Sequence, residues 1–551
     1  MKFHHVVFDP EVLADAFFDH PERGPAARDL VEKVLNRELT GWIPAQCLPA
    51  IEARIRSGAE RTGSGPQEAG RRSAEYLEWV CRNFRILTLP GQESKELVAR
   101  AVRLEEAQIA LAASALGSEA CVATSREGFD TQGAVEACSP ADLIGSAPAP
   151  RPGRIDLVDL GEQQRRLLPG LERRVRSVLR QGRFIMGPEI PELEKGLAEY
   201  VGVRHALCCA SGTDALLLGL LAFGVGPGDA VLTSPFTFIA TAEVIALVGA
   251  TPVFVDIDPR TFNLDPACLD KALAALRRND PAVYPLPRAA PHAKLRAKGI
   301  IPVDLFGQPA DYDSIGRLAR EHDLFVLEDA AQSFGGDYRG HRAGSLGHVG
   351  ATSFFPSKPL GCYGDAGAVF TDDDELAGKM SSLRVHGQGS NKYDNIRIGL
   401  NARCDTLQAA VLLSKLEAFP EEIRARQEIA RAYTRHLSAC PSVRTPFVAA
   451  GIRSAWAQYS LLSDNQASIR KILADRGVST AVYYPRPLHL QPAFSGSGYR
   501  EGDFPVSEDA ARRIFSLPMH PYLSEEKIRY VADLVTKAAD SGSPIEEESR
   551  G

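Results

Sequence analysis

The segment Leu324-Phe-Val-Leu-Glu-Asp-Ala-Ala-Gln332 decides the fold of most of this chain. Its first four residues form a short apolar run, which is typical of a buried strand. Such a strand delivers Asp329 to its carboxyl end, where open α/β sheets bind their ligands. A second segment follows, Ser353-Phe-Phe-Pro-Ser-Lys-Pro-Leu-Gly-Cys-Tyr-Gly-Asp-Ala-Gly367, in which Lys358 stands 29 residues (358 − 329) after Asp329. The two segments predict an α/β sheet with a carboxylate and an amine at one edge.

A third segment, Ala210-Ser-Gly-Thr-Asp-Ala215, follows the strand-like run His205–Cys209 and begins an apolar helix. A Ser-Gly-Thr turn at a helix N-terminus offers N–H groups, hydroxyl donors and the positive end of the helix dipole to a phosphate. Alone, Asp329 would be interpreted as a strand-end cap and Lys358 as a surface charge. Together with the phosphate turn, they form the set that pyridoxal phosphate (PLP) chemistry needs: a partner for the ring nitrogen, an amine for a Schiff base and a phosphate site.

Longer motifs resemble the DegT/StrS-type sugar aminotransferases, over roughly residues 155–540. The matching stretches are Gly299-Ile-Ile-Pro-Val-Asp-Leu-Phe-Gly-Gln-Pro-Ala-Asp311, Val385-His-Gly-Gln388, Ile398-Gly-Leu-Asn-Ala-Arg-Cys-Asp-Thr-Leu-Gln-Ala409 and Tyr483-Tyr-Pro-Arg-Pro-Leu-His-Leu-Gln-Pro492. Within the family, the chain is most similar to enzymes that aminate the 3-keto group of nucleotide-linked N-acetylamino-hexuronic acids. The resemblance implies a type I PLP-dependent aminotransferase fold, a doubly wound and mostly parallel sheet with a small C-terminal α/β domain.

The resemblance also implies roles for single residues at the cofactor. Lys358 would form the Schiff base and carry the proton, and Asp329 would keep the pyridine nitrogen protonated. Gln332 would bind the phenolic oxygen. The other cofactor candidates are Gly212, Thr213 and Ser353 at the phosphate, Phe238 over the ring, and Asn401 at the phosphate of a neighbouring subunit. For Phe238, core packing is a nearly equal alternative.

Arg403 is the candidate for a carboxylate clamp, because a planar guanidinium matches a carboxylate with two hydrogen bonds. L-glutamate, the expected amino donor, and a hexuronate both carry a carboxylate; a salt bridge to Asp405 is the alternative. The resemblance places Tyr483, Tyr484 and His489 in the sugar pocket, unless they pack the small domain. Since the loop with Asn401 and Arg403 would complete a neighbouring site, we expect a homodimer. Pro359 stands where the family usually has Asn, which removes an N–H beside Lys358.

Residues 1–144 have a pattern of their own, in which short strands alternate with helices. This order is similar to the PIN domains, small metal-dependent ribonucleases, and the matching pieces are Val6–Leu13, Leu104–Ala113 and Val122–Asp130. The carboxylates on family positions for Mg²⁺ or Mn²⁺ are Asp9, Glu52 and Glu106. Glu106 replaces the usual aspartate, and Arg126 stands where an acid is common. The sequence therefore favours a PIN-like fold over an active nuclease, and a docking module is the alternative.

The composition of residues 145–154, which alternate Pro with small residues, is that of a linker. We therefore expect a PIN-like domain at 1–144, this linker, a PLP-binding large domain at 155–420, a small domain at 421–540 and a disordered tail at 541–551. A chain of 551 residues is too long for one ordinary core, which agrees with several domains.

The composition also limits the partners. A net charge of −7 gives no general reason to expect nucleic-acid binding, unless the PIN-like unit is active. No apolar run approaches the roughly 20 residues of a membrane span, and the N-terminus lacks the apolar core of a signal peptide. Ten cysteines without Cys-x-x-Cys pairs fit a reducing compartment, so a cytoplasmic location is expected.

Three functions are open at this point. The favoured one is the transfer of an amino group, from L-glutamate, to a nucleotide-linked keto sugar for surface-polysaccharide or amino-sugar synthesis. The second is a ribonuclease or regulatory protein in which the PIN-like unit acts and the aminotransferase part is a scaffold. The third is a PLP-dependent sugar dehydratase of the same family, which normally has His at the position of Lys358, so that Lys358 disfavours it.

Overall fold

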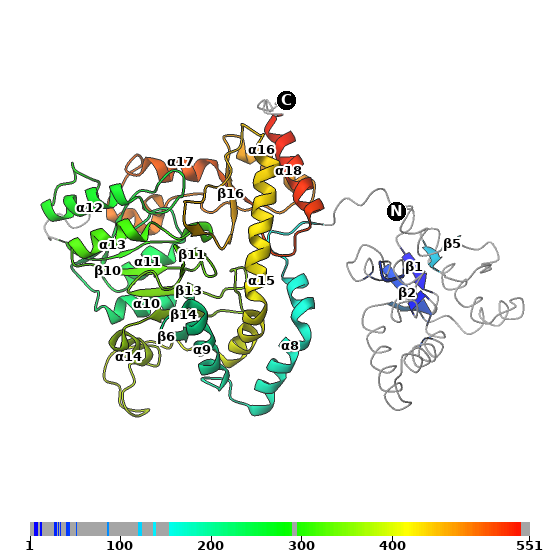
Figure 1. The fold of residues 1–551 in the computed structure, drawn as a ribbon, viewed down its shortest axis with the longest axis horizontal. Coiled ribbons are helices and arrows are strands. Elements are labelled where there is room, and N and C mark those ends of the chain that lie inside the picture. Colours follow the sequence, from blue (N-terminus) through cyan, green and yellow to red (C-terminus); the bar gives the residue numbers. More distant parts are fainter. Residues whose placement is uncertain are drawn as a thin grey trace, which may run out of the picture. The chain divides into compact units, whose positions relative to one another are not determined.

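The computed structural model describes residues 154–288 and 295–540, together with short pieces of the first 153 residues. The chain divides into two compact units, Met1–Gly153 and Arg154–Gly551 (Figure 1). Among the described residues, no helix has the length and apolar character needed to cross a bilayer.

The first unit contains a parallel sheet with the strand order β3-β2-β1-β4-β5. Its strands are β1 (His5–Phe8), β2 (Thr40–Pro44), β3 (Arg85–Leu87), β4 (Ala120–Ala123) and β5 (Glu136–Cys138). Parallel pairing is what the alternation of strands and helices predicts for this unit. The three metal-ligand candidates, Asp9, Glu52 and Glu106, lie outside the described residues, and so does the segment 541–551.

The second unit is built on a seven-stranded sheet in which only β14 runs antiparallel to its neighbours. In pairing order the strands are β6 (His205–Cys209), β14 (Gly367–Thr371), β13 (Val349–Ser353), β10 (Phe325–Asp329), β9 (Arg296–Ile301), β7 (Asp229–Thr233) and β8 (Thr251–Phe254). The segment 324–329 thus forms the predicted buried strand, since all five residues of β10 are buried.

Alternate residues of β10 serve two different cores, because successive side chains of a strand point to opposite faces. Val326 packs with α12 (Pro266–Arg278) and α13 (Tyr312–Glu321), whereas Phe325 and Leu327 pack with α10 (Gly212–Ala222) on the other face. Helices therefore cover both faces of the sheet, and the doubly wound, mostly parallel architecture is confirmed.

Further helices complete the large part of this unit. They are α8 (Leu160–Gln181), α9 (Glu189–Val201), α11 (Ala240–Leu247), α14 (Asp374–Leu383) and the 32-residue α15 (Thr406–Leu437). Helix α15 packs against α8, α9 and α18, and Figure 1 shows it running along one side of the unit. The boundary that we drew at residue 420 lies inside this helix, at Pro420.

The C-terminal part has its own core, formed by the second half of α15 and by the elements that follow it. These elements are β15 (Ile452–Arg453), β16 (Tyr459–Leu462), α16 (Gln466–Asp475), α17 (Pro505–Arg513), β17 (Ile514–Leu517) and α18 (Glu525–Asp540). Strands β16 and β17 pair antiparallel. A second α/β core therefore lies at the C-terminal end of this unit, and the small domain at 421–540 stays a prediction.

Candidate active site

Three of the predicted segments meet at one edge of the sheet. Gly367 at the start of β14 pairs with Ser353 at the end of β13 on one side and with Cys209 at the end of β6 on the other. Asp329 ends β10 and pairs with Ala351 of β13. Because these strand ends are neighbours, the carboxylate, the lysine segment and the phosphate turn converge, as the sequence predicts.

Asp329 is held rigidly at this edge and is only 6% exposed. Its N–H donates to Pro302 O (3.0 Å), and the Ala330 N–H donates to Ala351 O (2.8 Å). The Asp329 carboxylate accepts a hydrogen bond from Thr241 Oγ1 (2.8 Å) and a longer one from the Ala331 N–H (3.2 Å). Burial raises the pKa of Asp329, while these two donors and the charge of Lys358 lower it in part.

Lys358 lies in the turn that follows β13, where its N–H donates to Phe355 O (2.9 Å). Its side chain is half-buried. Desolvation lowers the pKa of Lys358, and the Asp329 carboxylate partly opposes this. A lysine with a lowered pKa has a larger neutral fraction at neutral pH, which is what a nucleophilic amine needs.

The turn before α10 has the form of an anion site. Ser211 caps the helix, its Oγ accepting from the Asp214 N–H (3.0 Å), and the N–H groups of Gly212 and Thr213 belong to the first turn, which has no intrahelical acceptors. A Cβ at Gly212 would lie 2.6 Å from the Ser353 Cβ. Only glycine therefore lets Ser353 approach this helix end.

Gln332 and Tyr484 form a contact that joins the large and small domains. The Gln332 Oε1 accepts from the Phe306 N–H (2.7 Å), and its Nε2 donates to the Tyr484 hydroxyl (3.0 Å). The rings of Tyr484 and Phe238 lie 6.3 Å apart. Phe238 is 56% exposed, so it does not pack in the core. Tyr483 is half-buried, with its ring 5.9 Å from that of Tyr484.

The segment 401–403 runs beside the phosphate turn of the same chain. Arg403 forms an antiparallel bridge with Cys209, and the Ala210 N–H donates to Ala402 O (3.1 Å). Asn401 is exposed. Among the described residues Arg403 forms no ion pair, and its Nε is buried without a hydrogen-bond partner. The alternative of a salt bridge to Asp405 is therefore wrong in this structure.

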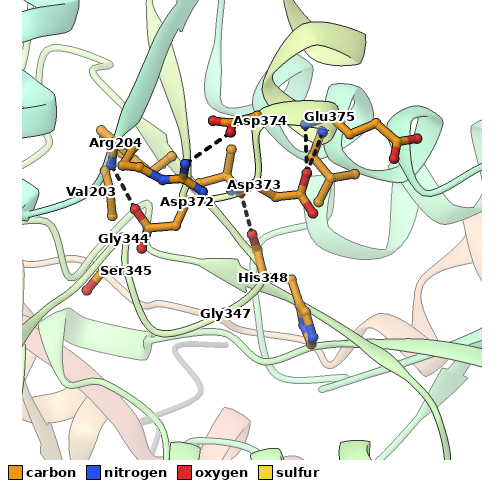
Figure 2. A pocket seen from close by; sticks show the side chains of 13 residues that line it. Val203, Arg204, Gly344, Ser345, Gly347, His348, Asp372, Asp373, Asp374 and Glu375 are labelled. Carbon is orange, nitrogen blue, oxygen red and sulfur yellow. Dashed lines mark hydrogen bonds and ion pairs between the residues drawn. The ribbon is translucent and has the colours of Figure 1, made fainter.

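The hollow in Figure 2, of about 520 Å³, is at the opposite edge of the sheet. The hollow lies beside Thr371, the last residue of β14, which pairs with His205, the first residue of β6. The candidate site lies at the other ends of these two strands, at Gly367 and Cys209. The Arg204 N–H donates to Asp372 (2.8 Å), and its guanidinium pairs with Asp374 (3.0 Å). These carboxylates already have partners, and the hollow lies away from Lys358.

The comparisons with known proteins agree with this geometry. The model of the DegT/DnrJ/EryC1/StrS aminotransferase family matches residues 170–536. The UDP-2-acetamido-2-deoxy-3-oxo-D-glucuronate aminotransferase of Pseudomonas aeruginosa is 47% identical over 382 residues, which are 69% of this chain and 99% of that protein. The chain belongs to this aminotransferase family.

Solved structures show the same fold for the aminotransferase. A family member from Brucella abortus is 48% identical, with a TM-score of 0.65 over 69% of this chain and 98% of that one. A sugar aminotransferase of Streptococcus pneumoniae, solved in its PLP form, is 25% identical, with a TM-score of 0.61 over 68% and 96%. The type I PLP aminotransferase fold is therefore confirmed. The matched residues include Lys358 and Asp329, and the scaffold alternative has no support.

One predicted site residue of the aminotransferase is placed elsewhere. The His489 side chain is fully buried, its Nε2 bonded to Glu508 Oε1 (3.0 Å) and its ring 4.7 Å from that of Phe504. The prediction that it lines the sugar pocket does not fit this burial, and packing of the small domain, the alternative, does.

Sequence reasoning missed two threonines of the aminotransferase site. Thr241 is buried and bonds to Asp329, and Thr237 Oγ1 lies 3.1 Å from Thr241 Oγ1. Thr237 lies in the bend before α11 and Thr241 in the first turn of that helix, so the chain segment that follows β7 supplies both hydroxyls. Their place directly after a strand end is the signal that could have found them.

Proposed function

We propose that this sugar aminotransferase uses PLP to move an amino group from L-glutamate to the 3-keto group of a nucleotide-linked hexuronate. The 47% sequence identity to the Pseudomonas enzyme supports a hexuronate as the sugar substrate, since that protein is named for a UDP-linked 3-oxo-glucuronate. The observation that carries the proposal is the meeting of Lys358, Asp329 and the Gly212 turn at one sheet edge.

The residues present fit this cofactor. The turn at Gly212 and Thr213, with Ser353 packed against it, would hold the phosphate, and the buried Asp329 would hold the ring nitrogen. Phe238, exposed beside Tyr484, would cover the ring, and Gln332 would bind its phenolic oxygen. When bound, PLP supplies an electron sink for the substrate α-carbon. Lys358 would attach the cofactor and, once displaced by the substrate, accept and return the proton.

Arg403 supports the choice of a carboxylate substrate. Its Nε is buried without a hydrogen-bond partner among the described residues, and a buried donor left unsatisfied is costly. The carboxylate of L-glutamate or of the hexuronate would supply that partner. Tyr483 and Tyr484 would line the sugar pocket.

We propose a homodimer for the active form. Tyr393 is 86% and Ile398 93% exposed in the loop that leads to Asn401. Ile396 of the same loop is 57% exposed, and a group of large exposed hydrophobic side chains in one segment supports an interaction surface there. In a dimer, Asn401 would reach the partner's phosphate site. A cytoplasmic location stays part of the proposal, and the free thiols among the described residues are consistent with it.

For the first unit we propose a PIN-like fold, supported by its parallel order β3-β2-β1-β4-β5. The Mg²⁺ or Mn²⁺ site at Asp9, Glu52 and Glu106 stays a prediction.

Absorbance of the purified, PLP-loaded protein tests the proposed function. Addition of L-glutamate should move the visible band of the cofactor to the near-ultraviolet, and addition of the 3-oxo-hexuronate nucleotide should restore it. A control sugar that lacks the carboxylate should restore it far more slowly. If L-glutamate leaves the band unchanged, L-glutamate is not the amino donor. If both sugars restore the band equally fast, the hexuronate is not the preferred acceptor.

A further inference from the structure

Two carboxyl groups lie together next to Asp329 in the interior of the sheet. Glu328 is the β10 residue before Asp329, and Asp304 precedes the short helix η2 (Leu305–Gly307). Both residues are 0% exposed. Val303 forms a parallel bridge with Asp329, so the two segments are neighbours. Asp304 bonds to Tyr312 of α13, and Glu328 is on the same face of β10 as Val326, the face that α13 covers. Neither has a part in the proposed reaction.

Hydrogen-bond donors surround the pair, whereas none of the described lysines and arginines contacts it. Asp304 accepts from the Ala310 N–H (2.9 Å), the Tyr312 hydroxyl (2.9 Å) and the Ser333 hydroxyl (2.8 Å). Glu328 accepts from the N–H groups of Gly344 (2.6 Å) and Leu346 (2.7 Å). Within the described part of the chain, neither carboxyl forms a salt bridge, and the ionisable Tyr312 hydroxyl is hydrogen-bonded to Asp304.

Two adjacent carboxylates without a cation are strongly unfavourable in the interior. Burial raises the pKa of Asp304 to about 7 and that of Glu328 well above its usual range. One proton between the two groups removes the repulsion and supplies the donor for a hydrogen bond between them. Because Asp304 already accepts three donors, the proton belongs on Glu328.

The pair is tied on both sides to the residues of the candidate site. The Asp304 N–H donates to Asp329 O (3.1 Å), and Glu328 is joined to Asp329 by the peptide bond. Ser333, which donates to Asp304, directly follows Gln332. A shift of the Asp304 side chain would therefore move both Asp329 and Gln332.

We infer that Glu328 and Asp304 share one proton and act as positioning residues for Asp329 and Gln332. The positioning part rests on the proposed cofactor roles of those two residues, whereas the shared proton does not. The substitution Asp304→Asn separates the charge from the geometry. Its amide oxygen can accept from Ala310 and Tyr312, and its NH₂ can donate to an ionised Glu328 and to the Ser333 oxygen. The net charge and the partners are kept without a shared proton.

Asp256 supplies a matched control, because it is a buried aspartate of the same unit and has no carboxyl partner in the part of the chain that the structure describes. It accepts from the N–H groups of Ile257 (2.9 Å), Val506 (3.0 Å) and Ser507 (2.9 Å), and from the Ser507 hydroxyl (2.6 Å). In Asp256→Asn the amide NH₂ would face a donor, so we expect this variant to lose thermal stability while Asp304→Asn keeps it.

Infrared spectra of the loaded enzyme at neutral pH test the shared proton. The wild type should show the C=O band of a protonated carboxyl group. This band should be absent from the spectrum of Asp304→Asn and present in that of Asp256→Asn. If the wild type and Asp304→Asn have the same band, or if Asp304→Asn does not fold, the shared proton is wrong. This result does not depend on whether the proposed reaction is correct.

PLP affinity and the absorbance of the bound cofactor test the positioning. Asp304→Ala should bind PLP about tenfold more weakly with a shifted band, and Asp304→Asn should stay within about threefold with the wild-type band. If Asp304→Ala does not fold, Ser333→Ala, which removes one donor, should shift the band in the same direction. Wild-type affinity and an unshifted band in the folded variant would overturn the positioning role. Failure of the wild type to bind PLP would instead overturn the proposed function.

Discussion

The Thr241 hydroxyl donates a 2.8 Å hydrogen bond to the Asp329 carboxylate, and so joins the first turn of α11 to the carboxyl end of β10. The two residues are 88 positions apart in the sequence. Burial raises the pKa of Asp329, and Thr241 is the first of the groups that lower it. The threonine thereby helps to keep Asp329 ionised inside the protein.

Thr241→Val keeps the shape of this side chain and removes the donor. The pKa of Asp329 should rise, and because a lost hydrogen bond to a buried charge typically costs ~1.5–3 kcal/mol, kcat/KM should fall on the order of tenfold to a hundredfold. Thr241→Ser should recover most of the loss.

A control variant separates this effect from a general loss of stability. Thr233 is also buried, and its hydroxyl donates to the Ile301 carbonyl (2.8 Å). Thr233→Val should lower thermal stability but leave the absorbance of the bound cofactor unchanged. The same kinetic loss in both threonine variants would argue against a specific role for Thr241.

Replacement of Lys358 with Ala should remove the covalent attachment of PLP and lower turnover on the order of 10³-fold or more, without unfolding the protein. The reason is the position of this amine in the turn after β13, where the charge of Asp329 acts on it. Borohydride reduction followed by mass analysis should find PLP on Lys358 in the wild type. Lys379→Ala, which changes a half-exposed lysine on α14 that pairs with Glu375, is the control. Near-normal turnover of the Lys358 variant would disprove the assignment.

The burial of His489 predicts a pH dependence of stability rather than an effect on the substrate. Burial lowers the pKa of His489, although Glu508 partly opposes this. For a histidine with a lowered folded-state pKa, the stabilisation is full above the unfolded value of about 6.5 and is lost as the pH falls through it towards the folded value.

We therefore expect His489→Gln to lower the thermal stability at pH 8 and to weaken the further loss between pH 7 and pH 5. KM for the sugar nucleotide should stay within about twofold, since a fully buried ring makes no contact with the substrate. A large rise in KM with unchanged stability would restore the substrate role predicted from the sequence.

Arg403 should determine the preference for a charged sugar. Removal of one partner of a buried charge pair typically costs ~2–5 kcal/mol, so Arg403→Ala should lose on the order of 10²-fold or more in kcat/KM for the hexuronate. Arg403→Lys should recover only part of this loss, because an ammonium group cannot form the two parallel hydrogen bonds that a planar guanidinium forms with a carboxylate. Single-turnover measurements separate the sugar half-reaction from that of glutamate. Equal losses on charged and uncharged sugars would assign Arg403 to glutamate or to the structure alone.

The parts of the site that local sequence determines could be predicted. Asp329 at a strand end, Gly212 at a helix start and Lys358 after a strand each lie in a short segment whose pattern sets their place. The sheet edge then brings them together, because strands of this fold class end on the same side.

The contacts that depend on the tertiary fold could not be predicted in this way. Gln332 and Tyr484 are 152 residues apart, and nothing in either segment shows that their side chains meet. The motif Tyr483–Pro492 does not show which of its side chains are buried. His489 is buried because it bonds to Glu508, which lies 19 residues later in the sequence. The pairing of Asp304 with Glu328 likewise needs β9 and β10 as neighbours.

Transfer of labelled nitrogen tests the central claim most directly. The PLP-loaded protein is given ¹⁵N-labelled L-glutamate and UDP-2-acetamido-2-deoxy-3-oxo-D-glucuronate, and the nucleotide sugar is analysed by mass spectrometry and NMR. The account predicts an amino sugar with ¹⁵N on C3, formed by the wild type and not by Lys358→Ala. A nucleotide sugar without the label, or a label that appears equally with the Lys358 variant, would contradict it.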